Sequence, residues 1–439
     1  MMAHPVIERL RLLDPVGRQG RLLRILPSWL EADGPNVALG SLCEIGEAEG
    51  PVPPVVAEVV KVDSDHIALV PYGETAMLAA GAPVRALAED AAVPVGDGFS
   101  GRAIDALARP IDNQGPIQQW RKAPLFDVLP EPLERATPRA ALNTGIRALD
   151  GLLTLGRGQR VGIFAASGVG KTSLIAQLAR QAEADRLVLC LVGERGREVE
   201  QLWNEDLPPE VRARTTMVAA TSDKPAALRI RAVYQALALA RHWRAQGEHV
   251  LLILDSATRM AMAMRENGLA AGEPPTVRAY PPSVFSAIPR VIEHCGALTH
   301  GGAITAVFTV LSESDEVDDP ICEMMKSLLD GHIVLSRAMA ERGQFPAVDI
   351  ARSVSRNMHR LISAQQLADA RKVLGLIATY EESRTLIESG LYSAGSSQPI
   401  DAAIAAKPAI DRFLAQPQDE CAAADMTRTA LAGLAGGAG

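Results

Sequence analysis

The 439-residue sequence predicts an α/β protein with a small N-terminal β-barrel, a central parallel sheet with helices on both faces, and a C-terminal helical domain. Three observations favour this architecture. Short apolar runs separated by Gly, Pro and Asp fill residues 20–88, strand and helix patterns alternate after about residue 142, and polar, Ala-rich helical windows follow residue 361. A chain of this length that is 48% hydrophobic can bury a large core and divide into two or three domains.

Charge and cysteine content disfavour several classes of protein. A formal net charge of −8 and only 4% aromatic residues argue against a broad nucleic-acid surface, although a local basic channel stays open. Apolar runs such as Val250–Leu254 are too short to span a bilayer, and residues 1–30 show no secretory signal. The five cysteines have no paired spacing, which indicates reduced structural thiols. We therefore expect a cytoplasmic protein that binds no nucleic acid.

The first 90 residues divide into a short helix and a β domain. Residues 4–14 have the spacing of an amphipathic helix, which either packs on its own domain or docks a partner. The strand runs after it have closely spaced turns, which suit a small barrel or a sandwich, and we predict the barrel. The expected strands are Arg21–Leu26, Leu42–Ile45, Val55–Val62, His66–Pro71 and Pro83–Leu87.

The remaining chain is predicted to hold a connector, a parallel sheet and a helical end. Residues 89–140 are rich in Pro and Gly and are expected to wrap a surface. Helices are expected over Thr172–Ala184, Pro225–Ala245, 364–379 and 402–415, whereas residues 431–439 are expected to fray. The predicted strands are Val161–Phe164, Leu187–Val192, Thr215–Ala219, Val250–Leu254, Ala303–Thr309 and Ile333–Leu335. The domains are predicted at 1–19 (a partner-docking segment), 20–90 (β-barrel), 91–361 (phosphate-binding-loop domain, with the connector) and 362–439 (helical).

A phosphate-binding loop follows the strand Val161–Phe164 and leads into a helix. Glycines 168 and 170 let backbone N–H groups turn inward, and the helix N-terminus favours an anion. Lys171 is expected to reach the β- and γ-phosphates of ATP, and the Thr172 hydroxyl to ligate Mg²⁺. The general pattern begins with Gly where this chain has Ala165, which is tolerable if φ stays negative. The predicted nucleotide-binding residues of the loop are Ser167, Gly168, Val169, Gly170, Lys171, Thr172 and Ser173.

Two carboxylates are predicted beside this loop, because each follows a strand of the same sheet. Asp255 ends the apolar run Val250–Leu254, where it either orients the Mg²⁺ shell or caps the next helix, and we favour the metal role. Glu194 leaves the strand Leu187–Val192 at the same edge, where it can position and activate the water that attacks the γ-phosphate.

These blocks together resemble the catalytic subunits of rotary ATPases, whose core is a RecA-like phosphate-binding-loop fold, and look closest to the export ATPases of type III secretion systems. The resemblance runs from the Gly20 strand to about Ile410, in order and at matching spacing. Ala at position 165 is usual in that family, whereas Ala166 is a milder departure from a Gly. The blocks are Gly156–Arg160, Gly168–Thr172, Gly193–Val199, Asp255–Arg259, Gly272–Pro275, Tyr280–Phe285 and Leu329–Arg337.

The resemblance implies a homohexameric ring with ATP at the subunit interfaces. Glu194 matches the catalytic carboxylate of the family, and Arg195 matches a neighbouring site arginine. Arg356 matches an arginine finger that a neighbouring subunit inserts beside the γ-phosphate, a contribution that makes hydrolysis depend on assembly. Phe345 matches an aromatic residue that lies against the adenine, although its sequence fits a core residue equally well.

Three functions fit the resemblance. The first is an ATPase that energises protein export at a flagellum or an injectisome, and Leu391–Asp401 resembles the flagellar branch more. The second is a rotary ATP synthase subunit, and Glu194 argues for a catalytic one, since non-catalytic subunits usually carry Gln there. The third is a Rho-like hexameric nucleic-acid motor. The family also implies partners: a stator-like negative regulator at the N-terminal helix, a central stalk protein, chaperone–substrate complexes and an export gate at the inner membrane.

Overall fold

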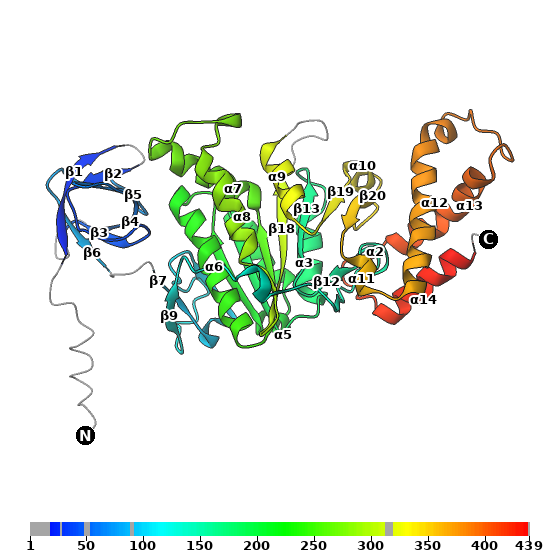
Figure 1. Cartoon of the computed structure of the whole chain (residues 1–439), viewed down its shortest axis with the longest axis horizontal. Coiled ribbons are helices and arrows are strands. Elements are labelled where there is room, and N and C mark those ends of the chain that lie inside the picture. The colour runs from blue at the N-terminus through cyan, green and yellow to red at the C-terminus, as the bar shows by residue number, and fades with distance from the viewer. Residues whose placement is uncertain (1–17, 27–28, 48–52, 88–91, 312–318, 438–439) are drawn as a thin grey trace, which may run out of the picture.

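The computed structural model describes residues 18–26, 29–47, 53–87, 92–311 and 319–437. The molecule is elongated, with a β-barrel at one end, a central α/β domain, and a C-terminal helical domain at the other end (Figure 1). The predicted helix at residues 4–14 lies outside the described residues. In the described part of the chain, helices long and apolar enough to cross a membrane are absent.

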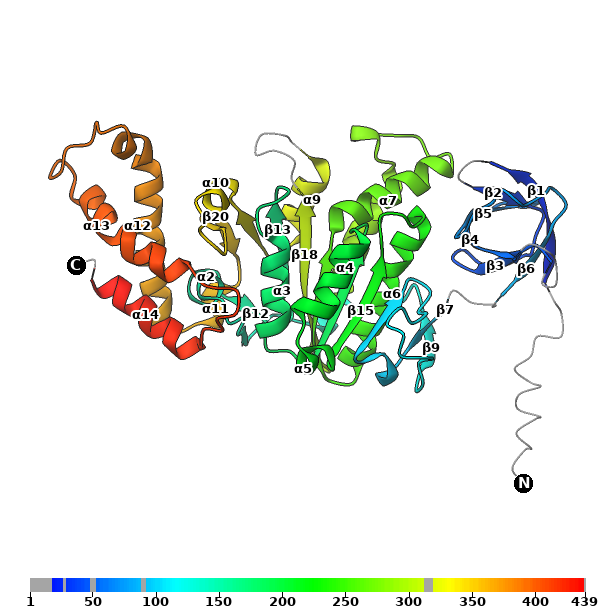
Figure 2. The same cartoon turned by 180° about the vertical axis from the view of Figure 1, so that it is seen from behind.

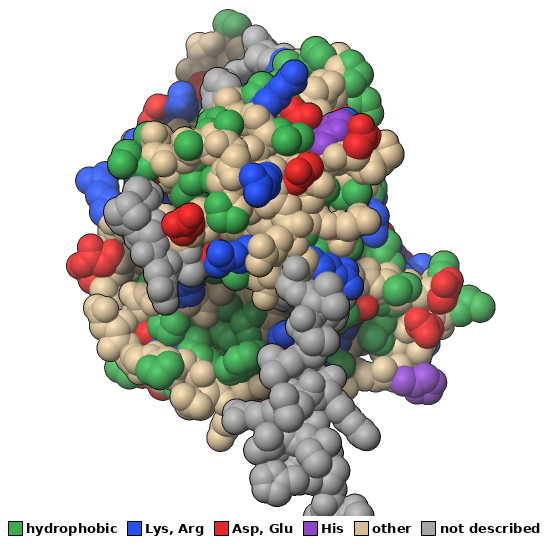
Figure 3. All heavy atoms as spheres, turned by 90° about the vertical axis from the view of Figure 1, so that its left-hand side faces the viewer, with side chains coloured by type: hydrophobic (Ala, Val, Ile, Leu, Met, Phe, Trp, Pro, Cys, Tyr) green, Lys and Arg blue, Asp and Glu red, His purple; other side chains and the backbone are tan. Residues whose placement is uncertain are grey.

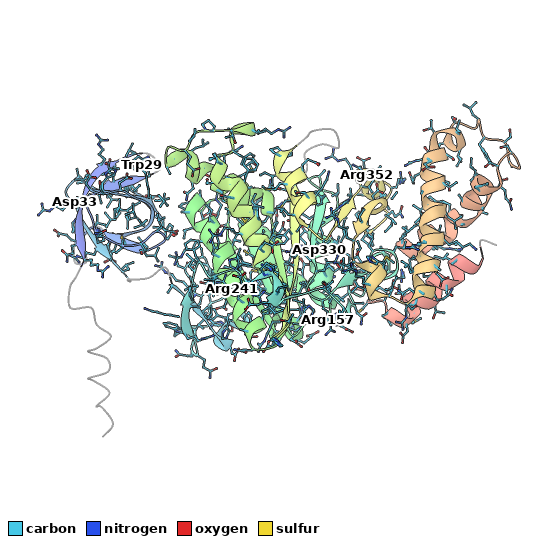
Figure 4. All side chains as sticks on the ribbon, in the orientation of Figure 1. Trp29, Asp33, Arg157, Arg241, Asp330 and Arg352 are labelled. Carbon is cyan, nitrogen blue, oxygen red and sulfur yellow. The ribbon has the colours of Figure 1, made fainter. Side chains whose placement is uncertain are left out.

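The N-terminal domain is a closed barrel with strand order β1-β2-β5-β4-β3-β6, as predicted. Alternate residues point inward: in β4, Val55, Ala57 and Val59 are buried while the residues between them are not. Trp29 and Asp33 also lie in this domain (Figure 4), and the sequence prediction missed the short strand between them. The strands are β1 (Gln19–Ile25), β2 (Leu30–Ala32), β3 (Leu42–Ile45), β4 (Val55–Val62), β5 (Ile67–Pro71) and β6 (Pro83–Ala86).

The central domain is built on a sheet with strand order β20-β19-β13-β18-β16-β14-β15-β8, in which all strands from β19 to β8 run parallel. The edge strand β20 is antiparallel to β19. The strands are β8 (Arg102–Asp105), β13 (Arg160–Ala165), β14 (Arg186–Val192), β15 (Thr215–Ala220), β16 (His249–Asp255), β18 (Ala303–Leu311), β19 (Gly331–Leu335) and β20 (Val348–Ser355).

Both faces of this sheet are buried under helices. Helices α6, α7 and α8 cover one face (Figure 1), and α3 and α4 cover the other (Figure 2). In β14, Leu189 packs in one core, whereas Val188 and Cys190 pack in the other. This burial explains why the central strands are unbroken apolar runs in the sequence. The helices are α3 (Lys171–Gln181), α4 (Gly196–Gln201), α5 (Pro209–Arg212), α6 (Ala226–Ala245), α7 (Ala257–Ala270), α8 (Pro282–Glu293), α9 (Pro320–Leu328), α10 (Arg337–Glu341) and α11 (Met358–Leu361).

The segment predicted as a connector contributes a strand to the main sheet. β8 pairs in parallel with β15, so residues 102–105 extend the sheet at its edge. The run Arg-Ala-Ile-Asp is too short for its periodicity to identify it as a strand. Shorter elements of this region and around the sheet are β7 (Ala92–Val95), β9 (Arg121–Pro124), β10 (Arg135–Ala136), β11 (Ala141–Leu142), α2 (Arg147–Leu152), β12 (Leu155–Gly156) and β17 (Gly296–Leu298).

The C-terminal domain consists of α12 (Ala364–Glu388), α13 (Gln398–Leu414) and α14 (Ala424–Gly436). The predicted fraying of residues 431–439 is wrong for residues 431–436, which are helical. Leu431 and Ala435 lie four residues apart on one helical face and are buried in the core shared with α2 and α3. The glycines near this end therefore do not prevent docking, because tertiary burial outweighs their weak helix propensity.

The barrel is joined to the central domain by a buried charged contact. Arg231 of α6 is only 4% exposed, and its guanidinium lies 3.5 Å from the Glu58 carboxylate of β4. Tyr72 donates a hydrogen bond to the same carboxylate. Burial raises the pKa of Glu58, although Arg231 and Tyr72 oppose this shift.

The first residue of β16 makes stability depend on pH. His249 lies with Nε2 2.8 Å from Thr305 Oγ1, and burial, reinforced by Arg157, lowers the pKa of His249 to about 4. The folded protein therefore favours the neutral imidazole of His249. Its contribution to stability is complete above the unfolded pKa of about 6.5 and is lost as the pH falls towards 4.

We expect His249→Gln to lower the thermal midpoint at pH 7 but to reduce the loss of stability between pH 7 and pH 5 by about 2 kcal/mol. Thermal unfolding at both pH values measures this difference. The exposed His300→Gln is the matched control and should retain the wild-type pH dependence. A His249→Gln protein that loses as much stability as the wild type would contradict the assignment.

Candidate active site

The predicted site residues meet at one edge of the sheet, where parallel strands end together. The phosphate-binding loop follows β13, Glu194 follows β14, and Asp255 is the last residue of β16. The carboxyl ends of parallel strands are where ligands of such sheets bind. At the opposite end of β13, Asp330 (Figure 4) accepts hydrogen bonds from Arg160 N and Nε at 2.9 and 3.1 Å, which fixes the start of the strand.

The loop has the backbone conformation that a phosphate cradle requires. Gly168 and Gly170 have φ values of +79° and +90°, which L-residues rarely adopt. Gly170 directly precedes the first turn of α3 and has no side chain to cap it, so the first N–H groups of the helix are available to an anion. Ala165 is an extended residue of β13, as its methyl group requires, and the side chain of Val169 is buried in the core.

Lys171 brings the two carboxylates together. Its Nζ atom donates to Asp255 Oδ1 at 2.5 Å and to Glu194 Oε1 at 3.3 Å. Glu194 and Asp255 are 7% and 4% exposed, so both charges are largely removed from water. A buried carboxylate needs such a cation or hydrogen bonds, because desolvation otherwise favours its neutral form.

Thr309 is a second partner of Asp255. It lies on β18 beside β16, and its Oγ1 donates to Asp255 Oδ1 at 2.5 Å. The role of helix cap that was open for Asp255 is filled by Ser256, whose Oγ accepts a hydrogen bond from Arg259 N at 3.2 Å. Asp255 therefore faces the loop rather than the N-terminus of α7.

Glu194 also lies beside an arginine. Arg259 of α7 has its Nε 3.5 Å from Glu194 Oε1. The preceding residue, Gly193, has φ of +72°, and a Cβ there would lie 2.7 Å from Cδ of Arg259. A glycine before Glu194 thus permits both the turn and the close approach of the Arg259 side chain.

Lys171, Glu194 and Arg259 line an open pocket of about 550 Å³. Asp255 and Thr309 are not among the described residues of its wall, and neither are Val169 and Ser173 of the predicted loop set. The predicted residues Ser167, Gly168, Gly170 and Thr172 contribute to its wall, as does Arg195. The sequence prediction missed Arg259, Thr309 and several residues of the pocket wall. Arg259 was detectable, since it lies one helical turn after Asp255, whereas Thr309 is a buried strand residue that carries no sequence signal. The pocket residues not predicted as site residues are Ala166, Glu198, Arg259, Leu311 and Arg337.

Phe345 and Arg356 are the two predicted site residues that come from the segment around β20. Neither belongs to the described residues that line this pocket. The ring of Phe345 lies over the loop, since a Cβ on Gly170 would be 3.2 Å from its Cε1, and the side chain is 39% exposed rather than in the core. Arg356 follows β20 on the surface, where its guanidinium donates to Lys326 O at 3.1 Å.

Comparison with known proteins matches the central and C-terminal domains to two family models. Residues 145–355 match the nucleotide-binding domain of the ATP synthase alpha/beta family, and residues 362–433 match the T3SS EscN ATPase C-terminal domain. The chain is 43% identical to the flagellum-specific ATP synthase of Bacillus subtilis, with 99% of both chains covered. It is 42% identical to the type 3 secretion system ATPase of Xanthomonas euvesicatoria, with 94% of this chain and 93% of that protein covered.

A solved structure has the same fold over nearly the whole chain. The assembled ATPase EscN of the type III secretion system of enteropathogenic E. coli superposes with a TM-score of 0.89 at 38% identity, covering 95% of this chain and all of that one. EscN in complex with its central stalk EscO gives a TM-score of 0.87 at 37% identity, with the same coverage. The chain belongs to the type III secretion ATPase family.

In a type III secretion ATPase the pocket must accept a nucleotide, and the residues present fit one. The loop offers unpaired N–H groups and Lys171 to a polyphosphate. In the described part of the chain, clusters of three or more acidic, His or Cys residues that would bind a metal by themselves are absent. Such a cluster is not needed for Mg²⁺, which takes most of its ligands from phosphate and water and only one or two from protein. The Thr172 hydroxyl and the Asp255 carboxylate are suitable donors.

We expect Thr309→Val to lower kcat about 10-fold, because Asp255 would lose a buried hydrogen bond worth roughly 1–2 kcal/mol. Steady-state ATP hydrolysis at saturating Mg²⁺ measures this effect. Thr309→Ser keeps the hydroxyl and is the control, which should remain within about twofold of the wild type. A Val variant that hydrolyses ATP as fast as the wild type would contradict a role for this hydrogen bond, and so would equal losses in the Val and Ser variants, which would indicate disturbed packing at this position.

Proposed function

We propose that this protein hydrolyses ATP with Mg²⁺ to energise type III protein export at a bacterial flagellum. The observation that supports this proposal most is the meeting of Lys171, Glu194 and Asp255 beside the phosphate-binding loop. The family membership supports the same reaction, since the relatives compared are named as flagellum-specific ATP synthases or type 3 secretion system ATPases.

Each residue of the cluster is assigned a role. Lys171 and the N–H groups of the loop, Ser167 to Ser173, bind the phosphates, which compete with the two carboxylates for the ammonium group. The Thr172 hydroxyl and Asp255 hold Mg²⁺, which neutralises polyphosphate charge when bound. Glu194, released from Lys171, orients the attacking water and accepts its proton. Arg195 and Arg259 lie where they can attract phosphate oxygens, and Phe345 packs against the adenine.

The role of arginine finger, proposed for Arg356, requires a second copy of the chain. Arg356 lies on the surface and outside the pocket of its own chain, which is compatible with insertion into the site of a neighbour. EscN, which shares the fold, is an assembled ATPase. We therefore propose a homohexamer in which Arg356 supplies positive charge to the γ-phosphate of the adjacent subunit.

The flagellar assignment follows from the segment Leu391–Asp401 and from the match to the flagellum-specific ATP synthase of Bacillus subtilis. A central stalk protein is a proposed partner, by analogy with EscO bound to EscN. We also propose the partners that the family implies: a stator-like negative regulator at the N-terminus, chaperone–substrate complexes and the export gate. The protein would then work in the cytoplasm, at the inner-membrane export apparatus. We place its domain boundaries near residues 19, 90 and 361.

An injectisome ATPase is the nearest alternative, and a rotary ATP synthase subunit or a Rho-like motor is less well supported. The barrel end of the molecule mixes acidic and basic side chains without a continuous basic area (Figure 3), which does not favour nucleic acid on that face. Stimulation of hydrolysis by RNA would support the Rho-like alternative.

We predict that Lys171→Ala and Glu194→Gln each abolish turnover, by at least 100-fold, because each removes a group that acts on the γ-phosphate or the water. The Glu194→Gln protein should still bind ATP, since the amide keeps the size of the carboxylate. Phosphate release and ATP binding measure the two effects separately. Near-normal hydrolysis by Glu194→Gln would remove its catalytic assignment.

In the source cell, the chromosomal Glu194→Gln change distinguishes the proposed functions. Loss of swimming and of secreted filament protein, with ordinary respiratory growth, is the expected result. Intact swimming would indicate an injectisome, and a respiratory growth defect would indicate an ATP synthase.

Arg356→Ala is predicted to abolish turnover in pure form but to regain part of it when mixed with small amounts of Lys171→Ala protein. The reason is that a mixed interface can combine an intact Lys171 from one subunit with an intact Arg356 from its neighbour. Hydrolysis rates across mixing ratios, with assembly checked by light scattering, measure the rescue. No rescue at any ratio in assembled mixtures would count against a finger supplied by a neighbouring subunit.

A further inference from the structure

The link between α13 and α14, residues 415–422, lies against the central domain, and we call it the strap. The first residue of α2 holds it from one side: Arg147 donates to Phe413 O at 2.8 Å and to Ala415 O at 2.6 Å, and pairs with the Glu420 carboxylate. The last turn of α3 holds it from another side, since Arg180 donates to Gln418 O at 2.8 Å. The strap therefore contacts the end of the helix that begins at Lys171.

Gln181, next to Arg180, adds to this attachment. Its Nε2 donates to Glu420 O at 2.8 Å. Gly145 meets the strap closely, because Ala422 N donates to its carbonyl at 2.9 Å and a Cβ on Gly145 would lie 2.8 Å from Cys421 Sγ. With a φ of +72° as well, this position requires glycine.

Gln416 is the buried residue of the strap. It is 3% exposed, and its side-chain amide is fully used. Oε1 accepts from Arg147 N at 2.8 Å, and Nε2 donates to Gly145 O at 2.7 Å and to Glu420 O at 2.8 Å. A buried amide with three hydrogen bonds of this length has one orientation, so the backbone of Gln416 is held in place.

The backbone N–H of Gln416 continues this chain of contacts to the nucleotide site. It donates to Phe345 O at 2.8 Å. The ring of Phe345 lies over Gly170 of the phosphate-binding loop, and its side chain is 39% exposed. The position of that ring over the loop thus depends on a hydrogen bond from the C-terminal domain as well as on its own strand–loop segment.

We propose that Gln416 is a positioning residue for the base of the nucleotide, acting through Phe345. This inference rests on the proposed function, in which Phe345 packs against the adenine. Gln416 itself does not touch the reacting atoms. It fixes the strap so that Phe345 keeps its place over Gly170, from which its ring can stack on a base.

A positioning role of this kind changes the affinity for the base and has little effect on the rate of the chemical step. Loss of the Gln416 amide leaves the strap backbone free to shift and relaxes Phe345, but leaves Lys171, Glu194 and Asp255 with all their contacts. The expected effect of Gln416→Ala is a KM for ATP raised about 5- to 10-fold with kcat within about twofold. Inorganic tripolyphosphate, which has phosphates but no base, should compete with ATP equally well in the variant and the wild type.

The experiment measures KM and kcat for ATP, and the inhibition constant of Mg²⁺-tripolyphosphate, in the assembled full-length protein. Gln418→Ala is the matched control, since Gln418 accepts hydrogen bonds from Arg180 and Gln181 through its backbone carbonyl, which the substitution keeps, and its side chain is exposed. Gln416→Met, which has the same length without hydrogen bonds, replaces Gln416→Ala if the latter does not fold. Phe345→Ala and the double variant with Gln416→Ala complete the set.

The proposal predicts that Phe345→Ala raises the KM for ATP and that adding Gln416→Ala raises it no further, because both changes remove the same interaction. Independent, multiplying effects of the two changes would overturn it. So would an unchanged KM in Gln416→Ala, or an equal weakening of ATP and tripolyphosphate, which indicates a general structural role. If the wild-type protein does not hydrolyse ATP at all, the proposed function fails instead, and this result is distinct from the others.

Discussion

The contact between the Lys171 ammonium and two buried carboxylates is the interaction on which the rest of the site depends. Glu194 and Asp255 come from strands that are distant in sequence and are both nearly removed from water. A buried carboxylate is unstable in its charged form unless a cation or hydrogen-bond donors lie nearby. Lys171, Thr309 and Arg259 provide them from three further segments. The arrangement therefore exists only when the sheet is correctly assembled.

The sheet can bring these groups together because both of its faces are covered. Parallel strands connected by helices place every strand end at the same edge, and they bury the strands on both sides. The main-chain positions of the loop, Glu194 and Asp255 then follow from strand order alone. The two carboxylates lie together because β14 and β16 are neighbours, and the loop after β13, with only β18 between β13 and β16, brings Lys171 within reach of both. Function at this edge is thus a consequence of topology, with glycines 168, 170 and 193 allowing the local turns.

The sequence predicted most of this edge, because its signals are local. The strand–loop–helix pattern identified Gly168 to Thr172, and apolar runs ending in acidic residues identified Asp255 and Glu194. The structure confirmed the fold class, the barrel and the central strands to within a few residues. The sequence did not predict Thr309, β8 or the helical nature of residues 431–436, for separate physical reasons. Thr309 is one polar atom inside an apolar strand, β8 is four residues long, and α14 is stable only when its Leu431 face is buried against the central domain.

Gln416 illustrates what sequence reasoning of this kind cannot reach. Its four partners lie about 270 residues away, 71 residues away and four residues away along the chain, so no window of sequence contains them together. The amide is polar and would ordinarily be assigned to a surface. It is buried because two backbone segments, residues 145–147 and Glu420, present two acceptors and a donor at one point, and because a glutamine side chain can satisfy all three. A ring that lies over the phosphate-binding loop is thereby tied to the C-terminal domain through the backbone N–H of one residue, so in the role proposed for Phe345 a movement of that domain would reach the base.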